Sequence, residues 1–388
     1  MLLQAETLNR RNARKVVMQG IPVAPHTDGA PDFDKLAADI KIWGRELGFQ
    51  QVGISDIDLG EHPARFAGWI ARDFHAGMDF LANDFAKRTQ PATLIPGTRR
   101  VISVRMDYWP ADTRPMDVLR DGTRAYISRY ALGRDYHRTI RKRLQKFADR
   151  IVEAVGEFGY RAFVDSAPVM EKPLAEKAGL GWMGKHTVII NRQAGSYFFL
   201  GELFTDLPLP VDAPVSAHCG SCTACIDICP TKAIVAPYQL DSRKCISWLT
   251  IEYEGVIPEE LRAPIGNRVF GCDDCQLMCP WNRYAKVSPE KDFLPRNALD
   301  RASLRELFLW TEQDYLRATE GMALRRARYP VFLRNIAVGL GNAPYDAAIV
   351  AALESRLPDA DAVVAEHIGW ALTQQRQKGM NGLPQNRT

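Results

Sequence analysis

The chain has 388 residues, of which 46% are hydrophobic and 25% are charged, a composition typical of a globular protein. Its length allows about two or three domains, and the lack of any run of about 18 apolar residues predicts that no helix spans a membrane. The formal net charge is only +4, with a pI near 8.6, so composition permits a polyanionic partner without requiring one.

Residues 1–31 have no apolar period and are predicted to form a flexible extension. From residue 32 onward, helical and extended patterns alternate, which favours an α/β domain over residues 32–214. We expect helices over 33–47, 136–158 and 169–178, and strands over 51–54, 101–108, 161–164, 187–191 and 197–200. The outer face of helix 136–158 is basic, through Arg138, Arg141, Lys142, Arg143 and Lys146. It is either a solvated face or a contact for nucleic acid.

A glycine-rich loop, Ala178-Gly-Leu-Gly-Trp-Met-Gly-Lys-His186, matches G-x-G-x-x-G and nearly matches a P-loop. Both nucleotide-binding motifs require a strand before the loop and a helix after it. Here a helix precedes the loop and a strand follows it, so neither nucleotide function is predicted. The glycines still allow a large ligand to approach the backbone closely.

All eight cysteines lie between residues 219 and 280. The first group, Cys219, Cys222, Cys225 and Cys229 followed by Pro230, has the C-x2-C-x2-C-x3-C-P spacing of bacterial-type ferredoxins. The second group, Cys245, Cys272, Cys275 and Cys279 followed by Pro280, repeats it with an insertion after the first cysteine. We therefore predict a ferredoxin-like domain over residues 215–290 that holds two [4Fe–4S] clusters.

The fourth cysteine of each ferredoxin motif ligates the other cluster. This rule assigns Cys219, Cys222, Cys225 and Cys279 to one cluster, and Cys229, Cys245, Cys272 and Cys275 to the second. Zinc sites and disulfides are the alternatives for closely spaced cysteines. Thiolates that must stay reduced to bind iron predict a cytoplasmic protein.

Residues 291–388 are predicted to form a helical, HEAT-like region, with the final dozen residues disordered. Four arginines lie near the start of its paired helices: Arg325, Arg326, Arg328 and Arg334.

Several stretches together resemble the epoxyqueuosine reductase family. They are Tyr126-Ile-Ser-Arg-Tyr-Ala-Leu-Gly-Arg-Asp-Tyr-His137, Val164-Asp-Ser-Ala-Pro-Val-Met-Glu-Lys172, the glycine-rich loop, Gly201-Glu202 and the double cysteine motif. The resemblance implies reduction of the epoxide of epoxyqueuosine at the tRNA wobble position, which yields the cyclopentene of queuosine. It also implies a base-off cobalamin between the α/β domain and the cluster domain, with electrons supplied through the two clusters.

By this resemblance, seven positions are expected near the cobalamin: Arg88, Ser128, Asp165, Ile189, Leu200, Ile246 and Tyr253. Asp165 matches the family's proton donor. To donate a proton at neutral pH it would need burial that raises its pKa. Glu171 is the second candidate, although its place in a helix beside Lys172 favours an ion-paired surface residue.

The expected partners are tRNA, held by the four arginines and by phosphate contacts from helix 136–158, and an external low-potential electron donor. A monomer without membrane attachment is expected. Three alternatives remain open: a reductive dehalogenase-like enzyme with the same cofactors, an electron-transfer module, and a tRNA-binding protein with structural clusters.

Overall fold

The structure is a computed structural model that describes residues 31–382. The extension predicted for residues 1–31 therefore lies outside the described residues, apart from Pro31. The first half contains α1 (Phe33–Glu46), β1 (Gln51–Ser55), α2 (His62–Ala71), α3 (Asp79–Asn83), α4 (Phe85–Thr89), α5 (Pro91–Leu94), β2 (Arg100–Asp107), α6 (Pro115–Arg120), β3 (Tyr126–Ile127), α7 (Tyr136–Val155), β4 (Tyr160–Phe163), α8 (Glu171–Lys177), β5 (Trp182–Met183), β6 (Ile189–Ile190) and β7 (Phe198–Thr205). All the helices and strands predicted for this half are present, with boundaries shifted by a few residues.

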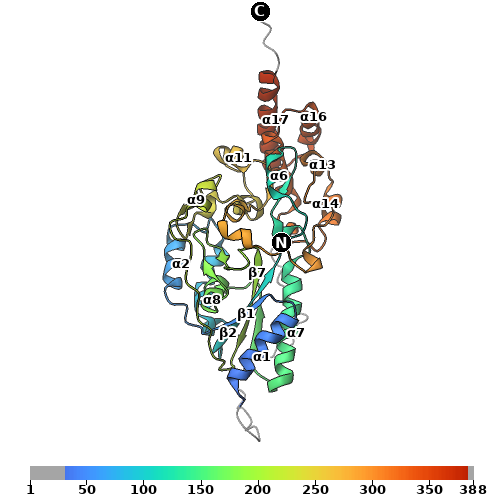
Figure 1. Cartoon of the computed structure of the whole chain (residues 1–388). Coiled ribbons are helices and arrows are strands. Elements are labelled where there is room, and N and C mark those ends of the chain that lie inside the picture. Colours follow the sequence, from blue (N-terminus) through green and yellow to red (C-terminus); the bar gives the residue numbers. More distant parts are fainter. Residues whose placement is uncertain (1–30, 383–388) are drawn as a thin grey trace, which may run out of the picture.

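The second half is mostly helical (Figure 1). It contains α9 (Ala224–Ile228), β8 (Ile234–Ala236), β9 (Gln239–Leu240), α10 (Ile246–Ile251), α11 (Glu259–Ile265), β10 (Arg268–Phe270), α12 (Asp274–Leu277), α13 (Leu304–Phe308), α14 (Glu312–Ala318), α15 (Tyr329–Asn342), α16 (Ala347–Arg356) and α17 (Ala362–Gly382). None of the helices within residues 31–382 is long and apolar enough to cross a membrane.

The central sheet has the strand order β1-β2-β7-β4, and every neighbouring pair is antiparallel. β2 and β7 pair along their full lengths, from Arg100 opposite Thr205 to Asp107 opposite Phe198. An α/β domain would instead have parallel strands joined by helical crossovers. The prediction of an α/β domain is corrected to an α+β arrangement, because β7 enters the middle of the sheet and runs against both neighbours.

α1 and α7 cover one face of this sheet, and α8 lies on the other (Figure 1). Each of the two long helices begins at an aspartate whose side chain caps free backbone N–H groups: Asp32 for α1 and Asp135 for α7. Apolar residues recur at helical spacing on their inner faces, and Ile40 and Leu144 pack there with Val104 of β2. α7 is thereby held against the sheet, and its first residue, Tyr136, stacks on Phe199 of β7.

A second core joins α13, α15, α16 and α17. It also contains Ile127 of β3 and Phe270 of β10, two strands that pair in parallel. Segments of all three predicted domains therefore share one core, and the domain boundaries remain predictions. The disorder predicted for the final dozen residues is wrong for 377–382, which continue α17. Lys378 anchors this part by donating hydrogen bonds to Gly341 O at 2.7 Å and Ala343 O at 2.6 Å.

Candidate iron–sulfur and proton-donor site

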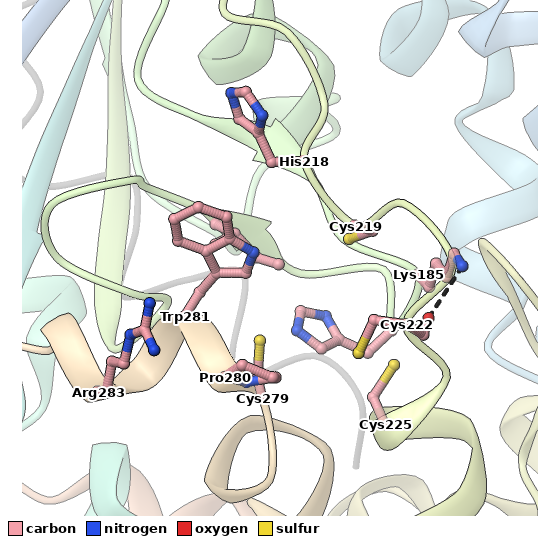
Figure 2. Close-up of a pocket in the computed structure, with 11 residues that line it drawn as sticks. Lys185, His218, Cys219, Cys222, Cys225, Cys279, Pro280, Trp281 and Arg283 are labelled. Atoms are coloured by element: carbon pink, nitrogen blue, oxygen red, sulfur yellow. Dashed lines mark hydrogen bonds between the residues drawn. The ribbon is translucent and has the colours of Figure 1, made fainter.

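Four cysteines from both cysteine motifs line one pocket of about 250 Å³ (Figure 2). Cys219 and Cys222 come from the loop before α9, Cys225 from α9 itself, and Cys279 from the end of the segment that contains α12. They are the four that the sequence assigns to one cluster. The rest of the lining consists of Lys185, His186, Ile190, His218, Pro280, Trp281 and Arg283.

Of the other four cysteines, Cys229, Cys245 and Cys275 pack in one group that also contains Cys225, and Cys272 lies two residues before α12. All eight cysteines are free thiols, so the structure contains no disulfide between them. Within residues 31–382, no three His, Cys, Asp or Glu side chains converge closely enough to hold a single metal ion.

Burial raises the pKa, and so disfavours the thiolate form, of five cysteines: Cys225, Cys245, Cys272, Cys275 and Cys279. It raises the pKa of Cys225 to about 11, with a further contribution from Cys279, and it raises the pKa of Cys275 well above the usual range. A bound metal deprotonates a coordinating thiol outright, because its positive charge compensates for the lost hydration. The donor set therefore fits positively charged groups that bridge several sulfurs.

Asp165 lies two residues after β4 and has a left-handed backbone, with φ +35°. Its carboxylate accepts a hydrogen bond from the Tyr136 hydroxyl, and His137 Nε2 lies 3.3 Å from Asp165 Oδ2. The other ring nitrogen of His137, Nδ1, lies 2.7 Å from Asp135 Oδ1. The first turn of α7 thus delivers a hydroxyl and an imidazole to the same carboxylate.

These contacts determine which of Asp165 and His137 carries a proton at neutral pH. Burial raises the pKa of Asp165, but the hydrogen bonds from His137 and Tyr136 outweigh it and leave the pKa below its ordinary value. The prediction of a raised pKa at Asp165 is therefore wrong for the chain by itself. The side chain is also 52% exposed. Burial lowers the pKa of His137, yet the Asp135 and Asp165 carboxylates outweigh burial and raise it to about 9. At neutral pH the proton is held by His137.

Arg88, on α4, is the predicted cobalamin neighbour that lies beside Asp165. It donates a hydrogen bond to Val169 O at 3.4 Å, and the charges of Asp165 and Glu171 act on it. Its Nε atom is buried and has no hydrogen-bond partner within residues 31–382. The Nε–H group of Arg88 is therefore free to donate a hydrogen bond to a polar group of a bound ligand.

The remaining predicted neighbours are mostly apolar and are brought together in two groups. Ile189 and Leu200 pack in one, and Ile246 and Tyr253 in the other. Ser128 is buried and donates a hydrogen bond to Asp273, which lies between Cys272 and Cys275. Asp273 also accepts from Tyr126 and from the backbone N–H of Arg129, each at 2.8 Å. The Ser128 segment is therefore tied to the cysteine loop.

The four arginines near α15 do not form one surface. Arg326 and Arg328 are exposed, but they pair with Glu252 and Glu254 of the inserted segment. Arg325 donates a hydrogen bond to the backbone oxygen of Leu316. Arg334 is fully buried, so its predicted contact with tRNA is wrong.

The reason is that α15 is enclosed on all sides, and Arg334 satisfies carbonyl groups there. It donates to Leu249 O at 2.5 Å and to Tyr253 O and Gly255 O at 2.8 Å. Burial lowers its pKa to about 10. Its function is structural.

The basic face of α7 has a different character. Arg138, Arg141, Lys142 and Lys146 are exposed, and none of them has an ion-pair partner in the described part of the chain. Arg143 is the exception, because it pairs with Glu290. This face begins one residue after His137.

Two segments of the chain match known family models. Residues 88–166 match the family described as "Epoxyqueuosine reductase QueG, DUF1730", and residues 218–282 match the "4Fe-4S double cluster binding domain". The epoxyqueuosine reductase of Pseudomonas aeruginosa is 62% identical over 343 residues, which cover 88% of this chain and 95% of that protein. The chain belongs to the epoxyqueuosine reductase family. The Escherichia coli epoxyqueuosine reductase is 55% identical, covering 89% of this chain and 91% of its own.

Solved structures of epoxyqueuosine reductases have the same fold. One is a crystal structure with an epoxyqueuosine-modified tRNA-Tyr stem loop; it is 26% identical, has a TM-score of 0.79, and covers 91% of this chain and 95% of its own. Another, from Bacillus subtilis, has its catalytic aspartate loop swung out of the active site. It is 25% identical, has a TM-score of 0.80, and covers the same shares of the two chains.

Two further acidic residues act on Asp165 or its surroundings. The environment predicted for Glu171 is wrong, and Glu202 was not predicted as a site residue. Glu171 is not an ion-paired surface residue: it is half-buried, and Lys172 donates to Thr187 O at 3.0 Å instead. Burial and the charge of Asp165 raise the pKa of Glu171 to about 7. Glu202, on β7, is fully buried, and neither carboxyl oxygen has a partner within residues 31–382. In the sequence, the apolar residues on both sides of Glu202 in a predicted strand were the signal that it is buried.

Proposed function

We propose that the chain reduces the epoxide of epoxyqueuosine in tRNA to the alkene of queuosine. The observation that carries the proposal is the Tyr136–His137–Asp165 group, which lies within the residues matched by the epoxyqueuosine reductase family. Removing an epoxide oxygen as water requires two electrons and two protons. The chain offers a proton-holding group and a segment matching a double-cluster domain, so both requirements can be met.

Electrons reach the site through two [4Fe–4S] clusters, one held by Cys219, Cys222, Cys225 and Cys279 and the other by Cys229, Cys245, Cys272 and Cys275. The shared pocket of the first four thiols supports this division. Cluster potentials extend down to about −700 mV, low enough for reduction of a corrinoid. An external low-potential donor supplies the electrons.

The proposed cofactor between the clusters and the substrate is cobalamin in its base-off form. When bound, it supplies a strongly reducing metal centre for the epoxide carbon. Arg88 and Ser128 would hold its polar groups, and Ile189, Leu200, Ile246 and Tyr253 would contact its apolar faces. The buried, unpartnered Nε of Arg88 supports this, as does the apolar packing of Ile189 with Leu200.

The protons come from the Asp165 group. His137 is protonated at neutral pH; Asp165 accepts its proton and passes it to the oxygen as the C–O bond breaks. Tyr136 fixes the orientation of the carboxylate. After His137 takes up another proton from solvent, a second transfer through Asp165 completes the water molecule.

The substrate is tRNA, as in the related complex with a modified stem loop. The unpaired basic face of α7 starts at the proton-donor group and extends away from it, so it supports contacts with phosphates on either side of the wobble nucleotide. Arg325, Arg326 and Arg328 contribute secondary contacts, because tRNA must first compete with their present partners. The protein is expected to act as a cytoplasmic monomer.

An anaerobic assay on two substrates tests this function. The loaded chain is expected to convert a tRNA stem loop containing epoxyqueuosine while leaving a halogenated phenol unchanged. Dehalogenation without conversion of the stem loop would favour the reductive dehalogenase alternative.

A further inference from the structure

The glycine-rich loop, residues 178–186, lies against the pocket formed by Cys219, Cys222, Cys225 and Cys279. Lys185 Nζ donates a hydrogen bond to Cys222 O at 2.9 Å (Figure 2) and another to Gly220 O at 2.7 Å. The backbone oxygen of Lys185 accepts from Tyr238 N at 3.0 Å. These bonds fix the loop to the cysteine segment at both the side chain and the backbone.

The next residue, His186, forms part of the wall of that pocket and is only 3% exposed. Its Nδ1 atom accepts a hydrogen bond from Val188 N at 3.1 Å. An accepting Nδ1 places the proton of the neutral ring on Nε2. Burial and the nearby charge of Lys172 lower the pKa of His186 to about 4, so the ring is neutral at pH 7.

The Nε2–H group has no hydrogen-bond partner within residues 31–382, although it is buried. An unsatisfied buried donor costs about 1–3 kcal/mol, and native proteins rarely leave one without a purpose. The pocket beside the ring contains four sulfur ligands. Trp182, from the same loop, packs against Cys219 and Cys279, and its Nε1 atom is likewise buried without a partner.

We propose that the glycine-rich loop supplies the hydrogen bonds around the cluster held by Cys219, Cys222, Cys225 and Cys279, and that His186 Nε2–H donates to a sulfur of this cluster. The inference rests on the proposed function, because it requires that cluster to be present. A hydrogen bond to a cluster sulfur stabilises the added negative charge of the reduced state, so it makes the reduction potential less negative.

The cluster held by Cys219, Cys222, Cys225 and Cys279, here called the outer cluster, thereby gains a role in electron entry. Of the eight cysteines, Cys222 alone is exposed, whereas Cys229 is buried and Cys245, Cys272 and Cys275 are partly buried. The external donor therefore meets the cluster beside His186 first. A potential raised by His186 lets that cluster accept an electron before the inner cluster does.

A redox titration followed by electron paramagnetic resonance tests the proposal. His186→Leu should make reduction of one cluster about tenfold less favourable, a shift of about 59 mV toward negative potential for one electron. The other cluster should keep its potential. His186→Gln, whose side-chain amide retains an N–H donor, should restore most of the shift. The matched control is His62→Leu, because His62 lies on α2 and does not line the pocket. It should leave both potentials unchanged.

Equal potentials in the wild-type chain and His186→Leu, with both clusters intact, would overturn the proposal. If His186→Leu fails to retain the cluster, the wild-type chain labelled with ¹⁵N-histidine answers the question. The reduced outer cluster should show a hyperfine coupling to one histidine nitrogen, and its absence would equally overturn the proposal. A wild-type chain that binds no iron would instead refute the clusters themselves, so the two failures are distinguishable.

Discussion

The Tyr136 hydroxyl, in the first turn of α7, donates a hydrogen bond to the carboxylate of Asp165, which follows β4. The two residues are 29 positions apart in the sequence. β4 follows α7 directly and packs against it, so the end of the strand lies beside the first turn of the helix. The next residue of that turn, His137, contacts the same carboxylate and holds a proton at neutral pH.

Replacement of Asp165 by asparagine should abolish most turnover while both clusters and the cobalamin remain bound. The amide cannot transfer the proton, and a positioned general acid contributes at least about 10²-fold to the rate. Single-turnover kinetics with a modified stem loop measure the loss, and iron and corrinoid spectra verify loading. Asp149→Asn, on the exposed surface of α7, is the control. Full activity of Asp165→Asn would remove this residue from the mechanism.

The ionisation of His137 should make stability depend on pH. Its folded-state pKa of about 9 is higher than its unfolded value of 6.5. The stabilisation it provides is therefore complete below about pH 6.5 and is lost as the pH rises through 9. The difference in unfolding free energy between the wild-type chain and His137→Gln should shrink between pH 6 and pH 10. Denaturant titrations at both values measure it, and a constant difference would contradict the assigned ion pairs.

Replacement of Cys229 by serine should damage the cluster that also contains Cys245, although Cys229 belongs to the first sequence motif. The cluster of Cys219, Cys222 and Cys225 should persist, because Cys279 completes its pocket. Iron content should fall from about eight to about four or less per chain, and the surviving resonance should match that of the outer cluster. Selective loss of the outer cluster would show that the crosswise assignment is wrong.

The basic face of α7 should carry much of the salt-dependent binding of tRNA. Exchanging Arg138, Arg141 and Lys142 for glutamine should weaken binding, and the slope of log K against log salt concentration should fall by up to about three. Fluorescence anisotropy at several salt concentrations measures both effects. An unchanged slope would mean that the face is merely solvated.

Arg334→Met serves as the contrasting variant for that experiment. It leaves three carbonyl oxygens without their donor, so it should destabilise the fold by at least about 3 kcal/mol. The salt slope of the folded variant should remain that of the wild-type chain, because Arg334 is buried.

The sequence predicted those features that depend on local spacing. The repeated motif predicted that Cys279 lies beside the first three cysteines, and all four line one pocket. Their joint ligation of a cluster stays a prediction. The helices α1 and α7 follow from capping aspartates and apolar periods. The burial of Arg334 could not be predicted in this way, because its three acceptors lie about 80 positions earlier in the chain. The pKa of Asp165 likewise depends on a helix that approaches it only in the folded sheet.

The topology of the sheet shows a further limit. Alternating helices and strands suggested parallel crossovers, but the strand order is β1-β2-β7-β4 and every neighbouring pair is antiparallel. Glu202 illustrates the consequence. It lies opposite Ser103 and Phe163 in the middle of the sheet, and its full burial follows from that register.

The most direct test of the account is an anaerobic single-turnover experiment. The chain is loaded with iron–sulfur clusters and cobalamin, reduced, and mixed with a stem loop containing epoxyqueuosine, and the released nucleoside is analysed by mass spectrometry. The account predicts that the nucleoside loses one oxygen atom as two electrons are consumed, and that this conversion is lost in Asp165→Asn. An unchanged nucleoside, produced by a fully loaded and reduced wild-type chain, would contradict it.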